Sequence, residues 1–210
     1  MLSSPKQPIT ILHHGDDERD SDKEVGGTVS TDLTDKGEKD VEKSADKLEG
    51  IKTLYTSPVE RAMQSAEIIR AEIHCKVDIY NELGAWKIGN FDGMDRKDFE
   101  TAQKYFVENP KELTFPEMPD FKLKESFGEF KNRVVKCWNE VANKGEKNIA
   151  LLTHSKNIKI LKAIMRYKSW NAEAKKEFCD PENKIPSGNV EVIKPKTKNP
   201  TTKLKPYEKN

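Results

Sequence analysis

Cysteine and long apolar runs are both scarce in this chain of 210 residues. Cys75, Cys137 and Cys179 are odd in number and widely spaced, so the sequence indicates neither a disulfide framework nor a cysteine zinc site. No stretch approaches the roughly 20 apolar residues that a membrane-spanning helix needs. Residues 1–10 lack the basic segment and apolar run of a secretion signal. We therefore expect a cytoplasmic protein without membrane partners.

Neither sign of charge is in excess. The chain has 37 Lys+Arg and 36 Asp+Glu, a formal net charge of +1, so no overall field favours nucleic acid or an anionic membrane. Arginine is rare beside lysine, which narrows the set of side chains that could bind a phosphate through two parallel hydrogen bonds. The arginines are Arg19, Arg61, Arg70, Arg96, Arg133 and Arg166.

Short β-favouring runs alternate with longer amphipathic segments along the chain. Strands are expected at residues 9–12, 54–56, 77–79, 148–153 and 189–193. Helices are expected at residues 34–50, 57–73, 96–107, 127–141 and 155–165. This alternation predicts an α/β fold with a mainly parallel central sheet and helices on both faces.

The length suits one domain with a modest insertion. We expect that domain over residues 1–194, with the insertion at about residues 96–124. Within it, the proline-containing stretch 109–124 is typical of an irregular loop that could cover a pocket. Residues 195–210 are rich in Lys, Pro, Thr and Asn and are expected to form a disordered tail. The sequence indicates neither the identity of the substrate nor the oligomeric state.

Two histidines lie where a strand is expected to end. His14 is followed by Gly15, which lets the backbone turn and approach a ligand closely. A neutral imidazole is a competent nucleophile toward phosphorus. His154 lies at a similar junction between a strand and the helix that begins at Ser155. Taken alone, a histidine at the end of a strand is more often structural than catalytic.

Two charged residues are candidates to complete such a site. Arg61 is expected in the first turn of a helix, where helix N–H groups and a guanidinium can bind one anion. Glu82 lies in a loop near Trp86, and an aromatic neighbour can raise the pKa of a carboxyl toward that of a general acid. In isolation, each residue is more often a solvated surface charge.

Together these residues fall into a collinear set of motifs. In chain order the motifs are Ile11-Leu12-His13-His14-Gly15, Leu33-Thr34-Asp35-Lys36-Gly37, Thr56-Ser57-Pro58 with Arg61-Ala62, Asn81-Glu82-Leu83 with Trp86, Thr153-His154, and Ile185-Pro186-Ser187-Gly188-Asn189. Their order and spacing resemble the histidine phosphatase superfamily, also called the phosphoglycerate mutase-like family. The resemblance extends from about residue 9 to residue 193 and implies a phosphoglycerate mutase-like fold.

The resemblance also implies an activity, namely hydrolysis of a small phosphorylated metabolite through a phosphohistidine intermediate. His14 would accept the phosphoryl group, while Arg61 and His154 would bind its oxygens beside the helix N-terminus at Ser155. Glu82 would protonate the leaving oxygen and then assist the attack of water. This scheme requires neither a metal nor another cofactor.

His13 departs from the resemblance, because the family has an arginine before the nucleophilic histidine. Loss of a charge-assisted hydrogen bond costs about 1.5–3 kcal/mol of binding free energy. Arg19 or Lys156 could compensate. An alternative function is therefore a catalytically impaired relative that binds a phosphorylated ligand or partner without efficient turnover. A metal site formed by His13, His14 and His154 is disfavoured, since adjacent strand residues point to opposite faces.

Overall fold

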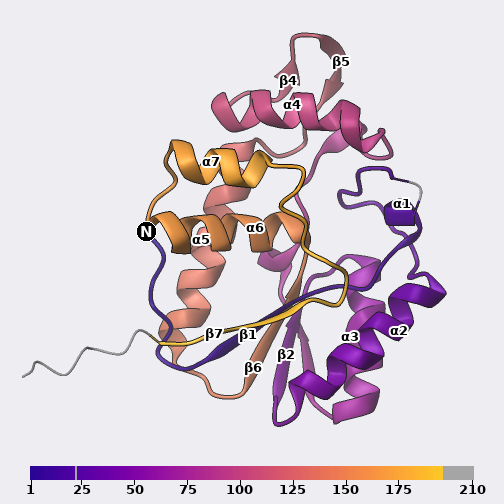
Figure 1. Ribbon diagram of the computed structural model, residues 1–210, viewed down its shortest axis with the longest axis vertical. Coiled ribbons are helices and arrows are strands. Elements are labelled where there is room, and N and C mark those ends of the chain that lie inside the picture. The colour runs from indigo at the N-terminus through magenta and orange to yellow at the C-terminus, as the bar shows by residue number, and fades with distance from the viewer. Residues whose placement is uncertain (22, 196–210) are drawn as a thin grey trace, which may run out of the picture.

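A five-stranded sheet in the order β3–β2–β6–β1–β7 forms the centre of the computed structural model, which describes residues 1–21 and 23–195 (Figure 1). Its strands are β1 (Ile9–His13), β2 (Thr53–Thr56), β3 (Lys76–Ile79), β6 (Ile149–Thr153) and β7 (Val190–Ile193). The first four pair in parallel, and β7 runs antiparallel to β1. The predicted α/β fold with a mainly parallel sheet is confirmed. Apart from Pro195, the expected tail lies outside the described residues.

Helices cover both faces of the sheet (Figure 1). One apolar cluster joins alternate strand residues such as Leu12 and Leu152 to α2 (Asp35–Ala45) and α3 (Glu60–Ile73). The other joins residues of opposite orientation, such as Leu151, to the second pair of helices. These helices are α5 (Phe127–Lys144) and α6 (Ser155–Tyr167). The division follows from the alternation of side chains along each strand.

Shorter elements complete the fold. They are α1 (Glu18–Ser21), α4 (Arg96–Glu108), α7 (Ala172–Cys179), the 3₁₀ turns η1 (Asp46–Leu48), η2 (Asn81–Leu83) and η3 (Gly89–Phe91), and the hairpin strands β4 (Thr114–Phe115) and β5 (Met118–Lys122). The hairpin lies beyond α4, at the top of Figure 1, and occupies the stretch that the sequence indicates as irregular. Pro119 is compatible with β5 because a two-stranded hairpin leaves one side of each strand unpaired.

Helix α3 begins later than expected. Ser57 and Pro58 lie in the turn before the helix, and Val59 is its N-cap residue. The Ser57 hydroxyl oxygen accepts a hydrogen bond from the Val59 N–H at 3.2 Å. Arg61 is therefore the second residue of α3, still within its first turn, as its proposed role in binding an anion requires.

Two glycines set the path of the chain just after β1. A Cβ atom on Gly37 would lie 2.1 Å from the backbone oxygen of Asp16, and one on Gly15 would lie 2.6 Å from the backbone oxygen of Gly37. The N–H of Gly15 also donates a hydrogen bond to the Ser65 hydroxyl at 3.0 Å. This close approach fixes the position of His14 relative to α2 and α3.

Candidate active site

Three histidines and one arginine meet at the carboxyl ends of β1 and β6. These strands are paired so that His13 lies opposite Thr153, which brings His14 and His154 together. The ring centroids of His13 and His14 lie 4.2 Å apart, and those of His14 and His154 lie 5.0 Å apart. Arg61 reaches the same point from α3 and is only 3% exposed.

The hydrogen bonds of His14 define which ring nitrogen is free to react. Nδ1 lies 2.6 Å from the backbone oxygen of Gly15, an acceptor, so Nδ1 carries the proton. Nε2 receives a hydrogen bond from Nε of Arg61 at 3.1 Å. Because a guanidinium only donates, Nε2 bears the lone pair, as a nucleophilic nitrogen must.

His154 is held in a single tautomer by the same reasoning. Its Nδ1 lies 3.3 Å from Nη2 of Arg61, which can only donate. Its Nε2 therefore carries the proton and donates to the Ser57 hydroxyl at 2.8 Å. Ser57 thus orients the second histidine, with the lone pair of Nδ1 directed toward the guanidinium.

His14 and His154 are both held in the neutral form. Burial lowers the pKa of His14 well below its usual value, and the neighbouring His13 and Arg61 lower it further. Burial and the charge of Arg61 likewise lower the pKa of His154 well below its usual value. A neutral His14 is available as a nucleophile at neutral pH without prior loss of a proton.

Asp17 is a buried acidic neighbour that the sequence analysis missed. Its Oδ2 atom forms an ion pair with Nε of Arg61 at 2.9 Å, and both side chains are 3% exposed. The Thr31 hydroxyl donates to the same oxygen at 3.2 Å. The run Asp16-Asp17-Glu18 after Gly15 was the available signal, but the sequence does not show which of these carboxylates turns inward.

His14, Asp17 and Asp20 are a set of described residues in which each offers a possible metal-ligating atom within 4.8 Å of the others. The Arg61 guanidinium contacts both His14 and Asp17. A cation between these groups would meet that positive charge directly. The chemistry of the cluster therefore fits an anion better than a metal ion.

His13 is buried and donates a hydrogen bond to a backbone oxygen late in the chain. Nδ1 lies 3.1 Å from the backbone oxygen of Pro186, so Nδ1–H donates to it. Burial lowers the pKa of His13 more than the charge of Asp20 raises it. His13 therefore supplies no permanent positive charge to the cluster.

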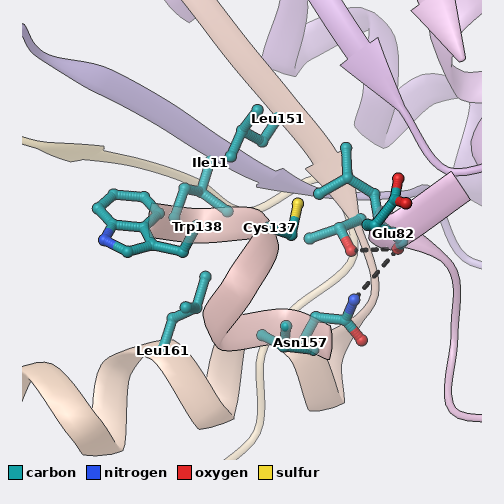
Figure 2. A pocket seen from close by; sticks show the side chains of 10 residues that line it. Ile11, Glu82, Cys137, Trp138, Leu151, Asn157 and Leu161 are labelled. Carbon is teal, nitrogen blue, oxygen red and sulfur yellow. Dashed lines mark hydrogen bonds between the residues drawn. The ribbon is translucent and has the colours of Figure 1, made fainter. Parts of the chain in front are cut away.

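Glu82 is not brought to the histidines by a hydrogen bond or an ion pair of its carboxylate in the described part of the chain. Figure 2 shows its side chain at a small, mainly apolar pocket that Cys137 and Asn157 also line. Burial and, after it, the charge of Glu82 raise the pKa of the Cys137 thiol in α5 to about 12. The role of Glu82 as an acid stays a prediction.

The loop that carries Glu82 is fastened through its backbone. Arg133 donates to the backbone oxygens of Glu82 at 2.8 Å and Gly84 at 3.0 Å. Asn157 donates to the backbone oxygens of Leu83 and Gly84, both at 3.1 Å. The role of Asn157 was missed, because nothing in a helical sequence indicates that an amide will bind a distant loop.

Helix α6 begins at the second histidine. His154 is its N-cap residue, and no side-chain hydrogen bond caps the helix. The first N–H groups, beginning at Ser155, therefore remain available to an anion at this end. Lys156 follows, with its ammonium 5.5 Å from the centre of the Phe99 ring. Burial and then the charge of Lys159 lower the pKa of Lys156 to about 7.

Arg19 is paired within its own segment. Its Nη1 atom lies 3.2 Å from the Glu24 carboxylate, where it forms a hydrogen-bonded ion pair. That contact directs the guanidinium to Glu24. Of the two cations that could compensate for His13, the structure therefore leaves Lys156 as the one without an ion pair among the described residues.

A family comparison places the chain among known proteins. The model of the histidine phosphatase superfamily, branch 1, matches residues 9–176. The chain belongs to this superfamily. A search of curated proteins found no match to this chain. None of the described helices of this superfamily member is long and apolar enough to cross a membrane.

Solved structures share the histidine phosphatase fold at low sequence identity. YhfR from Bacillus stearothermophilus has a TM-score of 0.69 at 18% identity, covering 88% of this chain and 89% of that one. The α-ribazole phosphatase from Shigella flexneri has a TM-score of 0.65 at 20% identity, covering 88% and 89%. The mycobacterial glucosyl-3-phosphoglycerate phosphatase complexed with VO3 has a TM-score of 0.68 at 15% identity, covering 89% and 90%. The phosphoglycerate mutase-like fold is thus confirmed.

Proposed function

We propose that this protein is a phosphomonoester hydrolase that acts on a small phosphorylated metabolite through a phosphohistidine on His14. The observation that carries the proposal is the state of His14. Its Nδ1–H is bound to the Gly15 oxygen, while the lone pair of Nε2 faces the Arg61 guanidinium. A phosphate held by that guanidinium would present its phosphorus to a neutral, oriented nucleophile.

Arg61 would hold the phosphate by exchanging its present partners. Its Nη2 atom donates to the backbone oxygen of Gly27 at 2.9 Å, and Nη1 donates to that of Val29 at 3.4 Å. Phosphate oxygens are charged and accept stronger hydrogen bonds than these neutral carbonyls. Movement of the Gly27–Val29 segment would therefore open the site and free the guanidinium for the substrate.

His154 and the start of α6 would bind the remaining phosphate oxygens. His154 is neutral in the free protein, but a nearby dianion favours the imidazolium and raises its pKa. The N–H groups from Ser155 onward add the positive end of the helix dipole. His154 and the first N–H groups of α6 would then stabilise the negative charge that develops on the phosphoryl oxygens in the transition state.

A second candidate function is binding of a phosphorylated ligand or partner without efficient turnover. The observation that favours it is the state of His13, which is buried, has a lowered pKa and donates to the Pro186 oxygen. His13 thus lacks the permanent charge that an arginine at this position would give to the phosphate.

Hydrolysis of p-nitrophenyl phosphate separates the two functions. We expect turnover by the wild-type protein and loss of more than about 99% of it in His14→Ala, because removal of a nucleophile eliminates the covalent route. His74→Ala is the matched control, since His74 ends α3 on the surface away from the site. Tight phosphate binding without turnover by the wild type would instead establish the second function.

A further inference from the structure

We propose that Lys156 binds a second anionic group, a carboxylate or a second phosphate, on the alcohol part of the substrate. This inference rests on the proposed function, because it takes the phosphoryl group of the substrate to lie between His14 and Arg61. It narrows the substrate class from small phosphorylated metabolites in general to phosphomonoesters whose alcohol carries a negative charge of its own.

Lys156 lies at the edge of the proposed phosphate site. It is the second residue of α6, and His154 is the N-cap residue of that helix. Its side chain is half-buried, and its ammonium lies 5.5 Å from the centre of the buried Phe99 ring on α4. The ammonium is therefore placed beside the phosphate site on the side toward α4.

Helix α4 brings a guanidinium to the same side. Arg96 lies three residues before Phe99, so the two side chains share one face of α4. Arg96 forms an ion pair with Asp20 at 2.7 Å. The Asp20 carboxylate in turn lies within 4.8 Å of a ring nitrogen of His14. A single acidic residue thus separates Arg96 from the nucleophile, and Arg96 and Lys156 approach the site from two different helices.

Positive charge is in excess around Lys156. Burial, and then the charges of Lys159 on α6 and Arg96 on α4, lower the pKa of its ammonium to about 7. Arg61 on α3 adds to this lowering of the pKa, and Asp20 on α1 opposes it. Asp20 already pairs with Arg96, while Lys156 has no ion pair of its own among the described residues. The ammonium therefore lacks a counter-ion.

An anionic group on the substrate would supply that counter-ion. A half-buried cation without a partner is costly to keep charged. A negative group beside it favours the charged form and raises its pKa. A carboxylate or a phosphate is such a group, whereas a hydroxyl or a methyl group is not. Lys156 would thus favour esters of charged alcohols over esters of neutral ones.

Binding of the transferred phosphoryl group itself is the main competing role, because Lys156 could replace the charge that His13 lacks. In that role Lys156 would act equally on every phosphomonoester. A site for a second anion acts instead on the charge at the far end of the alcohol. Substrates that differ only at that end therefore separate the two roles.

The experiment uses three esters with the same three-carbon chain, namely propyl phosphate, 3-phosphooxypropanoate and propane-1,3-diyl bisphosphate. Their far ends are a methyl group, a carboxylate and a second phosphate. We would measure kcat/KM for the wild type, Lys156→Met and Lys156→Arg. Lys162→Met is the control, since Lys162 pairs with Glu191. Calorimetric dissociation constants for His14→Ala, with and without Lys156→Met, report binding of the same esters in the absence of turnover.

We expect the wild type to prefer a charged ester over propyl phosphate by about 10- to 150-fold near pH 6.5, the equivalent of one charge-assisted hydrogen bond. The ester with the larger preference identifies the second anion as a carboxylate or a phosphate. Lys156→Met should lose the preference, while propyl phosphate itself should change by less than about fivefold, since the ammonium attracts any phosphate over a longer distance. Lys156→Arg should keep the preference into the alkaline range, where the wild type loses it as the ammonium becomes neutral.

The preference is a ratio between esters, so it does not depend on how much of a variant is folded. Equal losses for all three esters in Lys156→Met, or a preference that this variant retains, would overturn the inference and leave the proposed hydrolase standing. A preference in the dissociation constants without turnover by the wild type would overturn the proposed hydrolysis and support the second-anion site. Equal affinity for all three esters would overturn that site.

Discussion

The guanidinium Nε atom of Arg61 donates a hydrogen bond to Nε2 of His14 at 3.1 Å, so the proposed nucleophile and the proposed phosphate-binding group are in direct contact. The contact orients the imidazole before a substrate arrives. It also requires a phosphate to enter between the two side chains. Arg61 therefore has two functions in this account, and a lysine, with its single point charge, can replace neither well.

Arg61→Lys should raise the inhibition constant of inorganic phosphate by about 10- to 150-fold, the equivalent of one lost charge-assisted hydrogen bond. The fall in kcat/KM should be larger, because His14 also loses its orientation. Arg70→Lys is the control, since Arg70 is exposed and pairs with Glu67 on α3. Phosphate inhibition that is equal in both variants would remove Arg61 from the binding site.

His13→Arg tests whether the residue before the nucleophile contacts the phosphate. Burial lowers the pKa of His13, so its charge is present only on the acidic side of neutrality and is lost as the pH rises. Phosphate inhibition of the wild type should therefore weaken as the pH rises through the lowered pKa of His13, which lies below the usual value of about 6.5. His13→Arg should strengthen phosphate inhibition by about tenfold at the alkaline end of the pH series, and the inhibition should then depend less on pH. Parallel curves for the two proteins would show that His13 does not touch the phosphate.

Lys156 gives a second, separable dependence on pH. Its pKa is lowered to about 7, so the ammonium is charged below that value and neutral above it. If it attracts the substrate, Lys156→Met should abolish the part of phosphate affinity that the wild type loses as the pH rises through about 7. Lys156→Arg should retain that affinity up to about pH 9, since arginine stays charged there. Lys162→Met is the control because Lys162 pairs with Glu191 instead.

Gly37→Ala tests the close approach that positions His14. Alanine has the higher helix propensity by about 1 kcal/mol, so propensity alone predicts a gain in stability within α2. We expect a loss of about 1–3 kcal/mol instead, because the new Cβ would meet the Asp16 oxygen, a backbone atom, at 2.1 Å. Urea denaturation measures the difference. Gly26→Ala is the control, since its Cβ would meet nothing closer than 3.7 Å. Equal stability of the two variants would show that the backbone around Asp16 moves away from the new Cβ at little cost in free energy.

The sequence predicted the sheet and its main helices because their signals are local. The apolar runs of β1 and β6 are buried throughout, and Thr34 caps α2 by accepting the Gly37 N–H at 3.0 Å. The positions of His14 and His154 at strand ends followed from the β-favouring runs before them, and their common site followed from the family resemblance. These features depend on patterns of a few residues.

The features that the sequence did not show depend on distant contacts. Asp17 is a buried partner of Arg61, and Thr31, distant in the sequence, binds the same carboxylate oxygen. Glu82 lies in the expected loop, but the backbone contacts of Arg133 and Asn157 determine how that loop is held. The direction of a carboxylate within a loop is set by such tertiary contacts.

The covalent intermediate is the central claim of this account, and a quench experiment tests it directly. Wild-type protein mixed with an aryl phosphate, stopped in alkali and digested should yield one peptide that carries a phosphoryl group on His14. The label should be absent from His14→Ala and should disappear on acid treatment, as a phosphoramidate does. Steady hydrolysis with no phosphohistidine at His14 at any time, or with the label on another residue, would contradict the account.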